Sequence, residues 1–261
     1  MESEQMKRFN WLMSIILVLS ILLSPVSQMF GNHVYADTQE PQLEDSPKGY
    51  ITISVEKFTL GQGYIKDPIK VPFYEGDNGA KLVTDLLGEK NYDYRSTGSI
   101  ENSFYLSAVK DPESLGEIET IPQYILDMAG GISPNSDEWL GEFDFSWTSG
   151  WKYGVNREFL GRGLSEYKPQ DGDVMRVQFT VYGLGADLAN DADKDGLTAK
   201  IAEINSSDNK EELLEKPGVF QAYNYAYKLL VDMESKQGDI DKALQDLTMA
   251  LEAPEELGEA K

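Results

Sequence analysis

Hydrophobic and polar residues alternate along several short segments of this chain, in the pattern that is typical of β-strands. Over residues 50–55 an apolar side chain stands at every second position, with a threonine and a serine between. Residues 175–181 repeat the pattern. A period of two predicts strands with one buried and one solvent-facing side. We therefore expect the threonine and serine of the first strand to face solvent, together with Arg176, Gln178 and Thr180 of the second.

Two further strands and a helix are predicted in the same part of the chain. Residues 69–73 and 104–109 have strand patterns, and Pro72 confines the first of these to a sheet edge or a bulge, because proline cannot donate to the ladder. Residues 80–87 carry leucine and valine at helical spacing, and Gly88 favours a stop there. The order strand, strand, helix, strand, strand, strand predicts an α+β fold in which one helix packs on a mixed sheet.

The chain changes character after Asp187, where glycine becomes rare and helix-forming residues dominate. Three apolar stripes with helical spacing follow: one begins near Asp193, one covers 219–236, and one starts with Asp239 as its cap. Each predicted helix is too short to be stable alone. We therefore expect the three to pack against one another as a three-helix bundle over 191–255.

The N-terminal segment has the three parts of a secretory signal peptide. Two basic residues precede an apolar run over 11–23, and a polar stretch with small residues ends at Ala36. We expect residues 1–36 to be a signal peptide that is cleaved after Ala36; an uncleaved N-terminal anchor is the alternative. Residues 37–48 are polar with two prolines and are expected to be a flexible leader. The product is then secreted or extracellular, or associated with the cell surface, and it meets a membrane only through an uncleaved signal.

Composition excludes several kinds of chemistry. The chain has 23 Lys+Arg against 45 Asp+Glu and a formal net charge of −22, so DNA, RNA and other polyphosphate partners are repelled. Cysteine is absent, and the one histidine, His33, leaves with the expected signal peptide. Thiolate and imidazole groups are then unavailable for catalysis or for zinc ligation. We expect a protein that is not an enzyme and holds no obligatory cofactor, and an acidic, cysteine-free exported protein fits a Gram-positive source.

The most distinctive sequence is Ser-Gly-Trp-Lys-Tyr-Gly-Val-Asn at 149–156, followed by Asp-Gly-Asp-Val at 171–174. These strings resemble the transcobalamin-like C-terminal domain of Gram-positive exported proteins. The resemblance implies a β-grasp-like domain over 49–187, with an insertion at about 112–138. In the vitamin carriers such a domain closes over one face of cobalamin, so the resemblance also implies a cobalamin-like ligand. The tail at 191–255 more loosely resembles the three-helix FIVAR-type modules of bacterial surface proteins.

Aromatic residues around the first of these strings supply most of the candidate ligand-binding side chains. Flat aromatic faces stack on sugars or on a corrin-like ring. Trp151 and Tyr153 share one strand face, which is expected to be core, whereas Trp147 stands before a turn and is the better candidate for an exposed platform. The candidate ligand-binding residues are Trp147, Trp151, Tyr153, Asn156 and Tyr105. Core packing of a small sheet is the alternative interpretation of the aromatic run.

An acidic string mimics the opening of a calcium-binding loop. It consists of Asp191, Asp193 and Asp195 followed by a glycine. Such a loop needs a bidentate acid at its twelfth position, where this chain has Ala202. Helix capping is the alternative, since acids near a helix N-terminus favour the dipole. The sequence thus predicts no metal site, with weak Ca²⁺ binding by the three aspartates left open.

Three hypotheses of function follow from these patterns. The first is a non-catalytic secreted or cell-surface binding module that holds a cobalamin-like small molecule or a glycan against aromatic residues. The second is a structural or adhesive surface module with a surface-protein partner and no small ligand. The third is a hydrolase that uses a carboxylate pair such as Glu142 and Asp144. A cleft lined by Trp147 or Tyr105 favours the first hypothesis, and a fully packed aromatic core favours the second.

Overall fold

The computed structural model describes residues 46–88, 93–183 and 192–253, which form one compact unit. The predicted signal peptide with its cleavage point after Ala36, and most of the predicted leader, lie outside these residues. The described residues combine strands and helices in an α+β fold, which confirms the predicted fold class. They contain two hydrophobic cores, one around the strands and one among the C-terminal helices.

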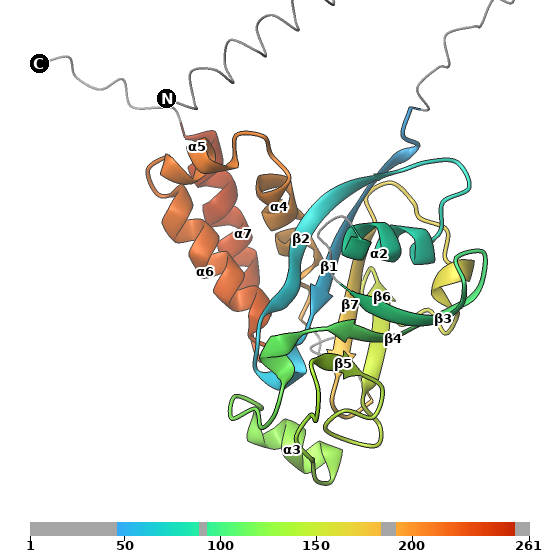
Figure 1. The fold of residues 1–261 in the computed structure, drawn as a ribbon. Helices are drawn as coiled ribbons and strands as arrows, with labels where there is room; N and C mark the ends of the chain where they lie inside the picture. Colours follow the sequence, from blue (N-terminus) through green and yellow to red (C-terminus); the bar gives the residue numbers. More distant parts are fainter. Residues whose placement is uncertain (1–45, 89–92, 184–191, 254–261) are drawn as a thin grey trace, which may run out of the picture. The chain divides into compact units, whose positions relative to one another are not determined.

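The main sheet has four strands in the order β2-β1-β7-β6 (Figure 1). Strand β1 (Gly49–Glu56) pairs antiparallel with β2 (Tyr64–Phe73) and parallel with β7 (Val174–Thr180). Strand β6 (Gly150–Val155) pairs antiparallel with β7. The sheet is therefore mixed, as predicted, and β2 lies at an edge, where its prolines are tolerated.

Helix α2 (Gly79–Gly88) follows the first hairpin and covers one face of this sheet (Figure 1). Its apolar stripe, which includes Leu82 and Leu86, joins Ile51 and Ile53 of β1 in the larger core. A hairpin, a packed helix and a last strand parallel to the first give a β-grasp-like arrangement, which the family resemblance implied; the sequence pattern itself predicted one helix on a mixed sheet. Period-two and helical spacing were sufficient here because each element buries a complete apolar face.

A second sheet was not predicted. Its three strands run in the order β3-β4-β5 and are antiparallel. Only β4 matches a predicted strand. Strand β3 buries no residue and so has no apolar pattern, and β5 has three residues, which is too short for a pattern to be recognised. The bounds are β3 Tyr94–Ser99, β4 Asn102–Lys110 and β5 Trp139–Gly141, and the nearby helices are η1 Phe58–Leu60, η2 Pro112–Ser114, α3 Gln123–Ala129 and η3 Leu164–Glu166.

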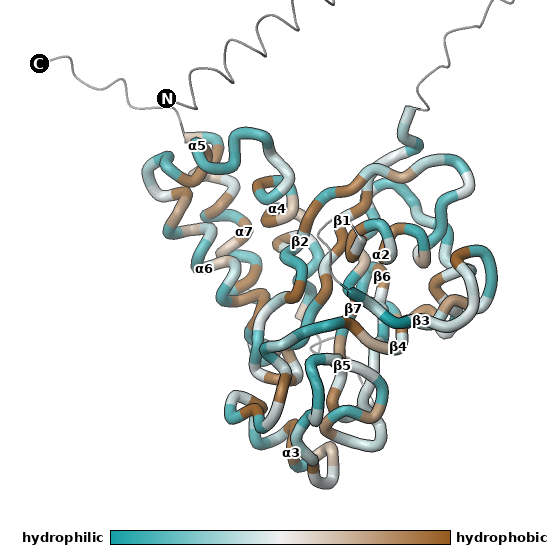
Figure 2. Tube along the Cα trace, viewed as in Figure 1, coloured by the Kyte–Doolittle hydropathy of each residue, from teal (hydrophilic) through white to brown (hydrophobic). Residues whose placement is uncertain are grey.

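The C-terminal region contains four helices among the described residues, where the sequence predicted three. They are α4 (Asp195–Asn205), α5 (Lys210–Glu215), α6 (Val219–Val231) and α7 (Gln237–Glu252). Helix α5 was missed because it buries none of its six residues. Hydrophobic and hydrophilic segments alternate along α6 and α7, as the predicted stripes require (Figure 2). Helix α7 begins before Asp239, which lies in its first turn and is not its cap.

The polar face of the main sheet is buried, which contradicts the prediction that it faces solvent. Arg176, Gln178 and Thr180 are at most 4% exposed. The carboxylate of Glu56 accepts hydrogen bonds from Arg176 Nε (2.8 Å) and Nη2 (2.7 Å) and from Gln178 Nε2 (2.8 Å). Thr52 and Ser54 are buried on the same face. The alternation of apolar and polar residues distinguishes the two faces of a strand. It cannot show that charges on the polar face are paired, which allows that face to be buried as well.

The helices attach to the sheet at its β2 edge. Asn205 Nδ2 donates to Pro68 O at 2.8 Å, and Ser206 Oγ accepts from the amide of Lys70 at 2.7 Å. Tyr227 Oη donates to Asp67 at 2.9 Å. The helical region thus closes one edge of the sheet. The predicted division of the chain at 49–187 and 191–255 stays a prediction.

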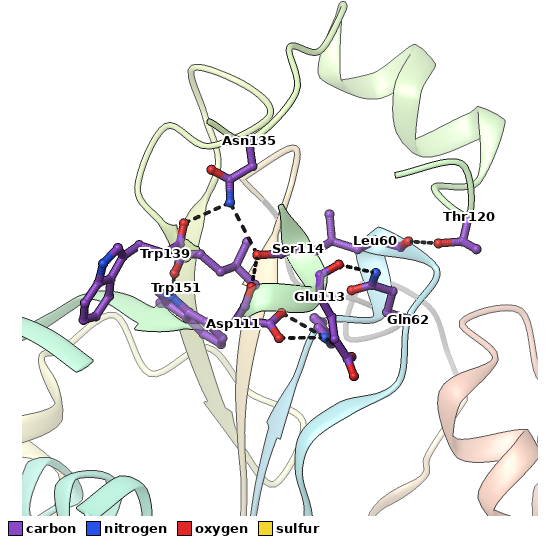
Figure 3. Close-up of polar contacts among 11 residues, drawn as sticks. Leu60, Gln62, Asp111, Glu113, Ser114, Thr120, Asn135, Trp139 and Trp151 are labelled. Atoms are coloured by element: carbon purple, nitrogen blue, oxygen red, sulfur yellow. Dashed lines mark hydrogen bonds and ion pairs between the residues drawn. The ribbon is translucent and has the colours of Figure 1, made fainter. Parts of the chain in front are cut away.

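A buried polar network attaches the segment between β4 and β5 to the main sheet (Figure 3). Lys57 Nζ, which is 2% exposed, contacts Asp111 Oδ2 at 2.8 Å and Glu113 Oε2 at 2.9 Å. Asn135 Nδ2 donates to Trp139 O at 2.9 Å. A buried ammonium is stable only when its donors are satisfied, so Lys57 holds Asp111 and Glu113 in place. The bond from Asn135 to Trp139 then fixes the start of β5. Among the described residues, no helix has both the length and the apolar composition that crossing a membrane requires.

Candidate functional site

A groove of about 450 Å³ lies between β4 and β6, under the segment 159–164. We call it the aromatic groove, because its walls include Tyr105, Trp151, Lys152, Tyr153, Phe159 and Arg162. Three of the five candidate ligand-binding residues are in this set. The volume is within the range of small-molecule sites, roughly 300–1,000 Å³.

A second hollow of about 270 Å³ adjoins the groove and shares Tyr105, Trp151 and Lys152 with it. Its outer wall is the loop 142–149, which contributes Trp147. The two hollows together therefore gather four of the five candidate residues along β6. Trp147 and Tyr105 are 78% and 38% exposed, so both are accessible to a ligand.

The loop 142–149 presents Phe143 and Trp147 to solvent from a fixed backbone. Phe145 is buried against Phe179, with ring centroids 6.4 Å apart, and the Ser146 hydroxyl donates to the carbonyl of Val181. Phe143, which precedes these anchors, is 65% exposed and has φ of 70°. A left-handed conformation at a bulky residue is strained, and strain of this kind clusters at functional sites. An exposed, strained aromatic beside Trp147 therefore adds to the case for a binding surface.

The side chains of Trp151 and Tyr153 form the rigid floor of the groove. The indole N–H of Trp151 donates to Leu140 O at 2.8 Å (Figure 3). The indole ring packs edge-on against Phe179, with centroids 5.5 Å apart. Tyr153 Oη donates to Arg162 O at 2.7 Å. Burial raises the pKa of the Tyr153 phenol, so this hydroxyl remains a neutral donor at physiological pH. The prediction that these two residues share an apolar, largely buried face is confirmed.

Tyr105 stands where the two hollows meet. Burial, together with a hydrogen bond to the carboxylate of Glu142, raises its pKa to about 12. The phenol therefore stays protonated, and it presents a ring face and a neutral hydroxyl to the site. A lowered pKa would be typical of a base or a nucleophile. The raised pKa of Tyr105 suits a residue that contacts a ligand without reacting with it.

Strand β6 is an edge strand, and its ends are paired by its own chain. The Ser149 carbonyl accepts from the Phe143 amide (3.4 Å), and the Val155 amide donates to Glu158 O (2.9 Å). Beyond β6, the Asn156 amide donates to Val174 O (3.0 Å) of β7.

Antiparallel residues alternate between facing the neighbouring strand and facing away from it. The backbone groups of Asn156 face β7, so those of Gly154 and Lys152 face β7 too. The N–H and C=O groups of Trp151 and Tyr153 therefore point to the free edge. No described residue hydrogen-bonds these four groups. The aromatic groove thus contains an unpaired stretch of sheet edge.

Two cationic side chains, Lys152 and Arg162, border the groove in an otherwise acidic chain. Both are exposed, and neither forms a salt bridge with a residue that the structure describes. The one acidic side chain in the wall of the groove is Glu166. The local charge of the groove is therefore opposite to that of the whole chain.

Asn156 lies apart from the other candidate residues. Its backbone has φ of 49°, its Nδ2 donates to Asp173 Oδ1 at 2.8 Å, and its Oδ1 accepts from the Val174 amide at 2.9 Å. Both ends of its side-chain amide are therefore used to join the turn after β6 to the start of β7. This places Asn156 outside the aromatic groove and accounts for its presence in the distinctive string by a structural contact.

The aspartates of the predicted calcium-loop mimic do not form a metal site within the described residues. Asp191 lies outside them. Asp193 Oδ1 accepts from the amide of Asp195 at 3.0 Å, and its Oδ2 lies 3.8 Å from Arg157 Nη1. No group of three or more metal-ligating side chains occurs in the ranges 46–88, 93–183 and 192–253.

The carboxylates of Glu142 and Asp144 lie in the turn after β5 and not in a strand. Asp144 Oδ2 accepts from the Gly141 amide at 2.6 Å, while Glu142 accepts from Tyr105. Burial raises the pKa of Asp144. The two acids therefore have separate partners, and the shared strand face on which the hydrolase hypothesis depended is absent.

Sequence reasoning missed three residues that border the site: Phe143, Phe159 and Arg162. Phe143 belonged to the aromatic run but stood in a segment of irregular spacing. Phe159 and Arg162 stand in a segment without helix or strand, so periodicity could not place them. Their proximity in sequence to the 149–156 string was the one available signal.

A comparison with protein-family models finds none that matches this chain, and a comparison with curated proteins finds no match. The resemblances to the transcobalamin-like domain and to FIVAR-type modules stay predictions.

Proposed function

We propose that this protein is a secreted or cell-surface binding module without catalytic activity, whose ligand lies in the aromatic groove and the adjoining hollow. The observation that carries the proposal is the gathering of Tyr105, Trp147, Trp151 and Tyr153 around two adjoining hollows along β6. Strand β4 supplies Tyr105, and the loop 142–149 with the strand β6 that follows it supplies the other three side chains. Tyr105 and Trp147 remain open to solvent.

The chemistry of the walls supports binding over reaction. Aromatic faces supply apolar contact area with few rotatable bonds, and phenol groups add a polar handle. The raised pKa values of Tyr105 and Tyr153 keep both hydroxyls neutral. A flat, partly polar molecule is the ligand that such walls suit, and this class includes a cobalamin-like ring and the apolar face of a sugar.

A thermal-shift panel tests the proposal. The chain from residue 37 onward is heated with cobalamins, with mono- and oligosaccharides and with Ca²⁺, each in separate samples. A ligand present at 100 times its dissociation constant adds about 2.7 kcal/mol of stability. We expect an organic ligand to raise the melting temperature, and no stabilisation by any compound that fits the groove would contradict the proposal in favour of a structural or adhesive role.

A pair of variants locates the site. Trp147→Ala removes an exposed ring from the groove region, and Phe220→Ala removes an exposed ring, 54% accessible, from α6. Both should leave stability within about 0.5 kcal/mol of the parent, because neither ring is in a core. We expect Trp147→Ala alone to lose the ligand-induced shift. Equal retention in both variants would place the ligand elsewhere.

A further inference from the structure

The free edge of β6 is a short, bounded template for another strand. Its four unpaired groups come in the order N–H and C=O of Trp151, then N–H and C=O of Tyr153. Ser149 and Val155 on either side are already paired with the chain itself. Unpaired edge groups attract other chains, and folded proteins usually cover them. Here they border the aromatic groove and a pair of cations.

We propose that the aromatic groove binds an extended peptide segment of a partner protein, which pairs with β6 as an additional strand. A peptide needs residues at two alternate positions to bond all four backbone groups, so three consecutive residues span the open stretch. Main-chain bonds then supply affinity, and the pockets for alternate side chains supply specificity. This inference rests on the proposed function, since it takes the groove to be the ligand site and names the class of ligand.

The side chains that flank the edge specify the sequence of the peptide. Residues directly opposite each other in a sheet share a face. The peptide residues opposite Trp151 and Tyr153 therefore point to the aromatic side, where apolar groups are favoured. The residue between them is opposite Lys152, which is exposed and favours a carboxylate. The preferred segment is thus apolar–acidic–apolar.

A second copy of this chain is a poorer occupant. Antiparallel pairing of β6 with itself about Lys152 places the two Lys152 side chains opposite each other, and like charges in that position are destabilising. Each copy also carries a formal charge of −22, which adds repulsion at long range. A partner peptide with one carboxylate avoids the repulsion between two Lys152 side chains and most of the repulsion between two acidic chains.

Synthetic peptides test the backbone pairing. The probe is acetyl-Thr-Val-Glu-Val-Thr-amide, and its binding to the chain from residue 37 onward is measured by calorimetry. N-methylation of both valine amides removes the N–H groups that face β6, and we expect affinity to fall at least about tenfold. N-methylation of the glutamate amide, which faces away, is the matched control and should change affinity little. Equal loss with both modifications would overturn the proposal.

The central residue of the probe tests the role of Lys152. Replacing Glu by Lys in the peptide should weaken binding, although the acidic chain as a whole attracts the basic peptide more strongly. Lys152→Glu in the protein should reverse this preference. Tighter binding of the basic peptide to the unmodified protein would show non-specific attraction and would contradict the proposed register.

Two substitutions at one position test the edge in the protein itself. Tyr153→Pro removes an outward N–H that no described residue bonds, and proline is tolerated where an edge N–H faces solvent. Tyr153→Val removes the same ring and keeps the N–H. We expect the proline variant to bind the probe at least about fivefold more weakly than the valine variant. Melting curves of both confirm that each is folded, and equal affinity would overturn the proposal.

The outcomes separate this inference from the proposed function. If a cobalamin or a sugar stabilises the protein and Trp147→Ala abolishes the effect, while the peptide does not bind, the groove is a ligand site and the peptide inference is wrong. If no compound and no peptide binds, both are wrong. If sedimentation shows a dimer that Tyr153→Pro dissociates, a second copy occupies the edge and the peptide inference is wrong.

Discussion

The two edges of the main sheet have opposite surroundings. At the β2 edge, Asn205, Ser206 and Tyr227 of the helical region hydrogen-bond to the strand and cover it. At the β6 edge, the backbone groups of Trp151 and Tyr153 have no partner among the described residues and face a groove lined by aromatic side chains. One edge is therefore closed by the fold, and the other is left open where the candidate binding residues gather.

The difference shows that an edge strand can either be covered and stabilise the fold or be left open and recognise a partner. An uncovered edge invites aggregation, and this chain limits the risk by pairing both ends of β6 with its own loops. Only two residues of the strand, Trp151 and Tyr153, have backbone groups that remain open to a partner. A short opening beside a groove of defined walls suits selective binding better than indiscriminate association.

The largest expected effect concerns the buried side of the sheet. Arg176→Met leaves the carboxylate of Glu56, which is 0% exposed, without its bidentate partner. Loss of one member of a buried ion pair costs about 3–5 kcal/mol, and urea denaturation measures it. Lys152→Met at the open edge is the control and should change the free energy of unfolding by less than about 0.5 kcal/mol. Similar losses in the two variants would contradict the contrast between the buried Arg176–Glu56 pair and the exposed side chain at the β6 edge.

A smaller loss is expected where the helices meet β2. Tyr227→Phe removes the hydrogen bond to Asp67 and keeps the ring that packs on Tyr64, with centroids 5.4 Å apart. A single hydrogen bond of this kind contributes about 1 kcal/mol. The free energy of unfolding, measured by urea denaturation, should fall by about that amount. No change would mean that this contact does not help to close the β2 edge.

The sequence predicted the elements that bury a regular apolar face and failed where burial has another cause. Strands β1 and β7 and helix α2 have clear periods, so their positions followed from the pattern. Strand β3 has no buried residue, so it gave no signal. The burial of Arg176 could not be read from the strand itself, because it depends on Glu56, which is 120 residues away in sequence.

The candidate site was partly predictable for a related reason. Trp151 and Tyr153 were found because aromatic residues on a strand stand out, and Trp147 because it precedes a turn. The open edge between them depends on which strand is outermost in the sheet. That order is a tertiary property, and local pattern does not determine it.

The smallest expected effect is a titration at the open edge. Tyr105 should ionise at pH about 12, since its folded pKa is raised mainly by burial and further by Glu142. Because the unfolded phenol ionises at about 10, the contribution of Tyr105 to stability is complete below pH 10 and is lost as the pH rises through 12.

Nuclear magnetic resonance of the labelled tyrosine ring follows this titration. Glu142→Gln removes the charged acceptor and should lower the pKa of Tyr105 while leaving it above 10, because burial remains. An unchanged pKa in this variant would show that Glu142 does not hold the phenol at the junction of the two hollows.

Residue-resolved amide hydrogen exchange of the ligand-free protein tests the open β6 edge most directly. Lys152 and Gly154 donate to β7, whereas Trp151 and Tyr153 face the groove. The amides of Trp151 and Tyr153 should exchange at least about tenfold faster than those of their two neighbours, since only the latter are protected by ladder hydrogen bonds. Equal protection of all four amides would show that the edge is closed, and the binding site proposed along it would then be wrong.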